Sequence, residues 1–286
     1  MMDIKFGYEI HFTCTQRTPM LLMLHSHPSR GADLITPDDM FTDPVLPLKI
    51  HRDAFGNRCT RLVAPRGQLL VMARGVMRDT GAAEPEHPAA REHAVESLPE
   101  DTLVYLLPSR HCETEFLMGP AWNLFGDTPP GWQRVQAICD FVHRTITHGI
   151  EHARATRTAW EVFQERRGVC RDFAHLAIAL CRCLNIPARF CTGYPGGIGA
   201  QSGGEPQDFS SWFEAYLGGA WHSFDPRHNQ RRIGRILIGR GRDAADVAVC
   251  TSFGPSLMDR LHVWVTQARG DRQPVPAQLG PLSRYA

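Results

Sequence analysis

The sequence has no excess of charge of either sign and no long apolar stretch. It contains 31 lysines and arginines against 30 aspartates and glutamates in 286 residues, so its net charge does not favour a nucleic acid or an anionic membrane as partner. No apolar run reaches the roughly 18 to 20 residues that a membrane-spanning helix requires. The first residues, MMDIKFGYEIHF, lack the basic and then apolar layout of a secretory signal. These absences favour a compact cytoplasmic protein.

The cysteines are not grouped as they are in a disulfide scaffold or a zinc site. They number nine and are spread from Cys14 to Cys250, whereas small disulfide-stabilised domains carry dense, even sets. Cys181 and Cys183 form a C-x-C pair, but no second pair and no histidine cluster at finger-like spacing completes a tetrahedral site. We therefore expect reduced thiols, no structural metal and no cofactor.

Two domains are expected at this length, because domains cluster near about 100–150 residues. Residues 1–80 hold short β-type runs separated by turn residues, which predicts an N-terminal antiparallel β domain. Residues 81–110 are rich in proline, alanine and glutamate and are expected to connect the domains, with a short strand at 103–107. Residues 111–286 are expected to form the second domain.

Within the second domain the apolar pattern changes from a helical period to an extended one. Apolar residues at three-to-four spacing predict several helices, and β-type runs follow them. This order indicates an α+β fold. The predicted helices are 113–125, 132–146, 158–166 and 170–185, and the predicted strands are 188–194, 211–217, 221–224, 235–239 and 261–267.

Cys170 stands at the predicted start of a helix, two residues after Gly168. The first turn of a helix carries unpaired N–H groups and the positive end of the helix dipole, which stabilise a thiolate. Arg167 and Arg171 are close in sequence, so we expect a lowered pKa for this thiol. From position alone, a small buried hydrophobic residue is the alternative interpretation.

Two longer segments contain this cysteine and the residues that follow it. Gly168 to Tyr194 reads GVCRDFAHLAIALCRCLNIPARFCTGY, and Trp212 to Arg227 reads WFEAYLGGAWHSFDPR. These two segments resemble the core of the transglutaminase-like superfamily. The resemblance lies in the order of a helix-starting cysteine, a strand with IPAR and GY, a W-x-E-x-Y-L strand and an FDP strand. The β-rich first part is similar to the N-terminal β domain of bacterial members.

The resemblance implies a papain-like thiol fold with a Cys-His-Asp triad, in which the thiol attacks an amide carbonyl and water or an amine resolves the thioester. By position, Cys170 is the nucleophile and Asp225 the carboxylate. The family histidine should precede Trp212 by two residues, where this sequence has Ser210. If Gly218-Gly219 is a two-residue turn, Trp212 faces Asp225, and Ser210 lies on the same face of the hairpin.

Two other residues are candidates for the missing parts of such a site. His228, three residues after Asp225, is the first choice as substitute base, with a loop histidine of no catalytic role as the alternative. Gln164, six residues before Cys170, could supply an amide to an oxyanion hole beside the Cys170 N–H, as a glutamine does in papain-like enzymes. The alternative for Gln164 is a solvated residue at a helix end.

Trp212 and Arg171, which lie within the two matched segments, are expected to contact the substrate. The arginine-rich run at 231–242 has two interpretations. It is either an ion-paired edge or a site that binds carboxylates of an acidic amide substrate.

Three functions remain open at this stage. The first is a cysteine-dependent peptidase, amidase or acyltransferase acting on a peptide-like amide. The second is a non-catalytic scaffold that binds a peptide or a partner enzyme. The third is an enzyme that exchanges acyl groups on thioesters, with Ser210 orienting a water or the substrate. Some bacterial relatives are encoded beside ATP-grasp-type ligases, which suggests such a ligase as a partner.

Overall fold

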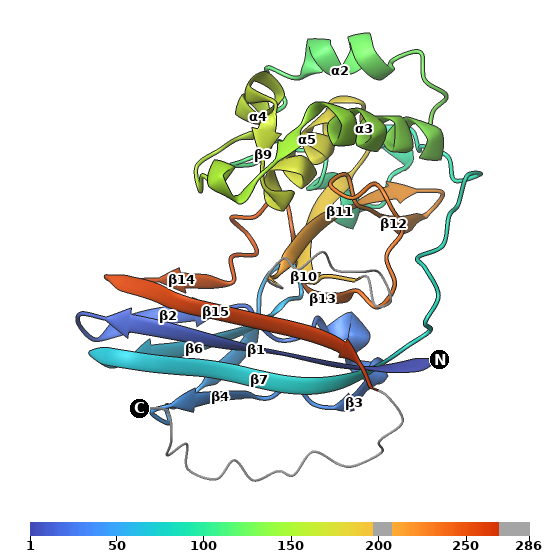
Figure 1. Ribbon diagram of the computed structural model, residues 1–286. Helices are drawn as coiled ribbons and strands as arrows, with labels where there is room; N and C mark the ends of the chain where they lie inside the picture. The colour runs from blue at the N-terminus through green and yellow to red at the C-terminus, as the bar shows by residue number, and fades with distance from the viewer. Residues whose placement is uncertain (197–207, 269–286) are drawn as a thin grey trace.

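The computed structural model describes residues 1–196 and 208–268. Antiparallel sheets form the lower part of the molecule in Figure 1, and helices with a further sheet form the upper part. The strands of the lower part are β1 (Met2–Cys14), β2 (Thr18–Leu22), β3 (Leu34–Thr36), β4 (Met40–Asp43), β5 (Lys49–Arg52), β6 (Arg58–Ala64), β7 (Gly67–Asp79), β14 (Cys250–Ser252) and β15 (Ser256–Gln267).

These strands pair into two sheets. One has the order β15-β1-β7-β3, with β4 also paired to β7, and the other has the order β14-β2-β6-β5. Alternate residues of β1, among them Phe6, Tyr8 and Ile10, are buried, as expected for a strand with one face on a core. The prediction of an N-terminal antiparallel β region is confirmed. Two of its strands, β14 and β15, come from the chain after residue 249 and pair with β2 and β1.

The upper part has the predicted α+β arrangement. One sheet with the order β12-β11-β10-β13 lies beneath the helices. The helices of the upper part are α2 (Met118–Phe125), α3 (Trp132–Thr145), α4 (Ala159–Glu165) and α5 (Cys170–Cys183). Its strands are β10 (Ala188–Tyr194), β11 (Ser210–Leu217), β12 (Ala220–Phe224) and β13 (Ile236–Gly241), with the two-residue strands β8 (Thr147–His148) and β9 (Arg167–Gly168).

The strand predicted at 103–107 is wrong. The helix α1 (Glu100–Leu103) and a turn occupy this part of the connection. Two acidic residues, Glu100 and Asp101, stand in the first turn of α1, where they interact favourably with the helix dipole. The backbone N–H and the hydroxyl of Thr102 both donate to the carbonyl of Pro99. These local interactions override the apolar run that suggested a strand.

Helix α5 is the centre of the upper part. Twelve of its fourteen residues are buried, because α2, α3 and α4 cover it on one side and β10 and β11 on the other. It ends where predicted, since Asn185 adopts a left-handed conformation with φ of 62° and Pro187 follows. A helix buried on every side has little freedom to shift, so its first residue is held in place.

The two parts share an aromatic contact near the start of β11. The ring of Phe209 packs against Tyr194, at 5.3 Å between centroids, and against Tyr8 of the lower sheet, at 6.2 Å. Phe6 of the same lower strand meets Tyr194 at 5.0 Å. The lower sheet therefore supports the strand that begins at Ser210.

Arg182, near the end of α5, connects several chain segments. Only 3% of it is exposed, and its guanidinium donates to the carbonyl oxygens of Leu107, Ala188 and Arg242 and to the hydroxyl of Ser109. Such acceptors lose a large part of their hydration when buried. The side chain therefore links the connection after α1 and the segment after β13 to the helix.

We predict that Arg182→Ala lowers the free energy of unfolding by about 3 kcal/mol or more, because it leaves several buried acceptors without a donor. The exposed Arg61 on β6 is a matched control, and Arg61→Ala should stay within about 0.5 kcal/mol of the parent. Urea unfolding followed by circular dichroism measures both. Equal stabilities of the two variants would contradict the bridging role.

Within the two described ranges, no helix is both long enough and apolar enough to cross a bilayer.

Candidate active site

The start of α5 is fixed by a buried carboxylate. Asp172 is completely buried, and its Oδ2 accepts a hydrogen bond of 2.9 Å from the N–H of Val169 and one of 3.2 Å from the guanidinium of Arg157. A Cβ on Gly168 would lie 2.6 Å from the Cβ of Asp172, so only glycine fits there without displacement. The chain therefore reaches Cys170 in one defined path.

Cys170 is half-buried as the first residue of α5. Burial raises the pKa of this thiol above its usual value, although the nearby charge of Arg227 and hydrogen bonds with the side chain and backbone of Ser211 act to lower it. The lowered pKa expected from the helix start is therefore wrong for the protein without substrate. Desolvation outweighs the favourable interactions, because a thiolate loses more hydration than a thiol on burial.

The two arginines expected to act on the thiol have other partners. Arg167 lies 3.5 Å from Glu165 and is largely exposed, and Arg171 donates to the carbonyl oxygen of Arg154 at 3.2 Å. The cation that acts on Cys170 is Arg227, which follows β12. Sequence reasoning missed it because the two residues are 57 positions apart in the printed sequence and meet only through the packing of the sheet under the helix.

Asp225 sits in a second group of charged residues. Its Oδ2 lies 3.0 Å from His228 Nδ1 and 2.9 Å from a guanidinium nitrogen of Arg235, and the N–H of His228 donates to its Oδ1. Burial acts to raise the pKa of Asp225, but His228 and Arg235 together lower it to about 2. The carboxylate is therefore ionised and fixes the orientation of the His228 ring.

The hairpin of β11 and β12 has the predicted register. Gly218 and Gly219 both have positive φ, as a two-residue type I′ turn requires, and Phe213 pairs with Phe224. Ser211 interacts with Cys170 through its side chain and its backbone. Successive residues of a strand point to opposite faces, so Ser210, at the position of the family histidine, lies on the other face of β11 from Ser211.

Trp212 is 2% exposed and packs under Arg235, whose guanidinium carbon lies 4.4 Å from the ring centroid. Its role in substrate binding stays a prediction, and its contact in the structure is with the charged group around Asp225. Gln164 is exposed on α4. The oxyanion-hole role of Gln164 also stays a prediction.

His148 lies close to the start of α5. His148 in β8 is the register partner of Gly168 in β9, two residues before Cys170, and its ring is 6.2 Å from that of Phe173. Sequence reasoning missed it because a parallel pair of two-residue strands leaves no readable pattern. His148 is therefore a second candidate for a base beside the thiol.

Most of the arginine-rich run is ion-paired within the chain. Arg231 lies 3.1 Å from Glu86, Arg235 2.9 Å from Asp225, Arg240 3.0 Å from Glu214 and Arg242 2.9 Å from Asp246. These pairs favour the interpretation as an ion-paired edge. Among the residues that the structure describes, no three His, Cys, Asp or Glu side chains are grouped to hold a metal ion.

Comparisons with known proteins agree with this architecture. Residues 123–226 match the model of the Transglutaminase-like superfamily, so the predicted resemblance is confirmed and the region containing Cys170 and Asp225 is transglutaminase-like. A crystal structure of a candidate cysteine protease from Cytophaga hutchinsonii is similar over 97% of this chain and 94% of that one, with a TM-score of 0.78 and 29% identity.

Two curated relatives are uncharacterized proteins. One, from Mycobacterium leprae, is 34% identical over 94 residues, which are 31% of this chain and 32% of that protein. The other, from Mycobacterium bovis, is 36% identical over 121 residues, which are 38% and 36% of the two chains. This chain thus spans about a third of the length of these relatives.

The two neighbouring serines give a matched test of the thiol's surroundings. We predict that Ser211→Ala slows alkylation of Cys170 by iodoacetamide at pH 8 by about fivefold, because loss of a hydrogen bond to the thiolate raises the pKa of the thiol. Ser210→Ala should leave the rate within twofold of the parent. The rates are measured by mass spectrometry of the Cys170 peptide, and equal rates for both variants would contradict the placement of Ser211.

Asp225 should contribute to stability in a pH-dependent way. Its pKa in the folded protein is about 2, below that of an unfolded aspartate, so its contribution is present above about pH 4 and is lost as the pH falls towards 2. We predict that Asp225→Asn lowers the free energy of unfolding by about 2 to 3 kcal/mol at pH 6 and by much less at pH 2.5. Urea unfolding at both pH values tests this, with Asp127→Asn, an exposed site, as control. A deficit that does not change with pH would contradict it.

Proposed function

We propose that this protein is a thiol enzyme that transfers or hydrolyses the acyl group of a peptide-like amide through a thioester on Cys170. The observation that carries the proposal is the position of this thiol at the start of the buried helix α5, with Ser211 and Arg227 acting to stabilise its thiolate. Cys170 and Cys250 are partly accessible, whereas the other seven cysteines are buried. The likeness to a candidate cysteine protease from Cytophaga hutchinsonii supports the same chemistry.

In the proposed reaction the Cys170 sulfur attacks the amide carbonyl, and the C–S bond forms as the carbonyl oxygen becomes an oxyanion. The positive end of the α5 dipole stabilises that charge, and Gln164 is the proposed second donor. The C–N bond then breaks, and the amine leaves with a proton. Water or a second amine attacks the thioester and releases the thiol. The thiol is largely protonated before substrate binds, so a base must take its proton.

We propose His228 as that base, with Asp225 as the residue that orients it. Their 3.0 Å contact is the one that a triad carboxylate makes with its imidazole, which holds the tautomer and stabilises the imidazolium. Trp212 and Arg171 stay the proposed substrate contacts, and Ser210 is proposed only to orient water or substrate. His148 near the start of α5 is the alternative base.

A second candidate function is acyl exchange on thioesters. Ser211 and Arg227 interact with Cys170, and neither a hydroxyl nor a guanidinium transfers protons readily near neutral pH. A thiolate leaving group needs no proton, so these residues would suffice for thioester exchange. An ATP-grasp-type ligase, which activates carboxylates, is the proposed kind of partner for either function.

Alkylation of the thiols tests the nucleophile. We predict that iodoacetamide at pH 8 modifies Cys170 at least tenfold faster than Cys250, the other partly accessible thiol, because the charge of Arg227 acts to lower the pKa of Cys170, whereas Cys14 acts to raise that of Cys250. Arg227→Met should move the pH profile of Cys170 alkylation upward by about one unit, and Arg227→Lys should largely restore it. Slow and equal labelling of Cys170 and Cys250 would overturn the proposal.

Activity assays separate the functions and the bases. Peptide amides and alkyl thioesters serve as substrates for the parent protein, Cys170→Ala, His228→Gln and His148→Gln. Loss of amide cleavage in Cys170→Ala and His228→Gln, with activity kept in His148→Gln, is the expected result. Turnover of thioesters alone would favour acyl exchange, and a biological activity that survives Cys170→Ala would favour a binding scaffold.

A further inference from the structure

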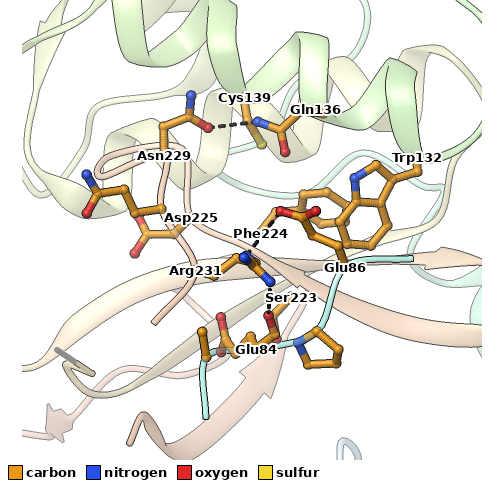
Figure 2. A pocket seen from close by; sticks show the side chains of 13 residues that line it. Glu84, Glu86, Trp132, Gln136, Cys139, Ser223, Phe224, Asp225, Asn229 and Arg231 are labelled. Carbon is orange, nitrogen blue, oxygen red and sulfur yellow. Dashed lines mark hydrogen bonds and ion pairs between the residues drawn. The ribbon is translucent and has the colours of Figure 1, made fainter. Parts of the chain in front are cut away.

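A cavity of about 520 Å³ lies between α3, the end of β12 and the segment 83–86, and Cys170 is not among the residues that line it. Figure 2 shows Gln136 and Trp132 of α3 in the upper part of the view and Glu84 of the segment 83–86 below them. Asp225 and Asn229 close one end. This volume is in the range of small-molecule sites.

Two polar groups that line the cavity make no hydrogen bond to another described residue. One is the indole N–H of Trp132, a residue that is 9% exposed. The other is the hydroxyl of Ser223. The amide nitrogen of Gln136 donates to Asp140 and Asn229 at 2.9 Å, which leaves its side-chain oxygen as an acceptor. The cavity therefore offers a donor, an acceptor and a hydroxyl.

The rim of the cavity carries one exposed charge of each sign. Arg231 lies 3.1 Å from Glu86, and these two side chains are 51% and 54% exposed. Arg231 also donates a hydrogen bond of 3.4 Å to the carbonyl oxygen of Glu84. Because exposed interactions of this kind contribute little to stability, either charged side chain can turn to a ligand at small cost. Glu84 and Asp225 are already held by Arg235, at 3.3 Å and 2.9 Å, so they add no free charge.

We infer that this cavity binds a small zwitterionic peptide, of dipeptide size, at a site separate from the thiol. The ammonium group of such a ligand would meet Glu86 and its carboxylate would meet Arg231. Its central amide would accept from the indole N–H of Trp132 and donate to the side-chain oxygen of Gln136. The apolar wall of Trp132 and Phe224, whose rings are 4.7 Å apart, covers the ligand backbone. The inference holds whether or not Cys170 is a nucleophile.

Calorimetric titration of the full chain with four matched probes tests the inference. Glycylglycine carries both charges and an amide, glycinamide carries only the positive charge, N-acetylglycine only the negative one, and N-acetylglycinamide neither. Glycylglycine should bind saturably, and each of the other three should bind at least tenfold more weakly. Equal binding of glycylglycine and glycinamide, or no saturable binding of glycylglycine, would overturn the inference.

Variants place the binding site. Trp132→Phe keeps the packed ring and removes the N–H, and Ser223→Ala and Arg231→Ala remove one polar group each. Trp132→Phe and Arg231→Ala should each weaken glycylglycine binding at least fivefold, whereas the control Arg61→Ala and the thiol variant Cys170→Ala should bind like the parent. Thermal unfolding confirms that each variant is folded. Binding that survives Trp132→Phe, Ser223→Ala and Arg231→Ala, or that is lost in Cys170→Ala, would place the peptide elsewhere and refute this site.

Discussion

The hydrogen bonds of the buried carboxylate of Asp172 fix the start of α5, and the arrangement around Cys170 depends on them. Asp172 accepts from the N–H of Val169 and from Arg157 at 3.2 Å. A buried carboxylate is costly unless it is paired and hydrogen-bonded, so these partners define a single conformation for the turn before the helix. Gly168 allows the close approach that this conformation needs. The thiol is thus held by interactions that take no part in its chemistry.

The alternation of side chains along β11 divides the residues around the thiol into two groups. Ser211 meets Cys170, whereas Trp212 packs under Arg235 beside Asp225. Arg227 follows Asp225 by two residues and brings its charge to the thiol. The residues around Asp225 and the residues around Cys170 are therefore joined by the short segment after β12. Burial raises the pKa of the thiol, so the proposed role of Cys170 as a nucleophile requires a base.

Much of the fold could be predicted from the sequence. The helix that begins at Cys170 and the glycine turn at 218–219 were predictable because local patterns specify them: an apolar stripe, a proline after the helix, and two residues that adopt positive φ. The predicted strand at 103–107 failed because an apolar run of five residues does not distinguish a strand from a helix and turn. The segment that contains α1 is held instead by capping interactions around Thr102, which the apolar pattern does not show.

The amino-acid sequence was sufficient to identify the transglutaminase-like core, the cysteine at the helix start and a serine, Ser210, at the position of the family histidine. Ser211 and Arg227 reach the thiol only in the folded protein, where burial also raises the pKa of Cys170. The same is true of β14 and β15, which pair with the first two strands of the chain. The physical reason is that helix starts and turns depend on neighbouring residues, whereas desolvation, ion pairing and strand pairing depend on residues that meet only when the chain has folded.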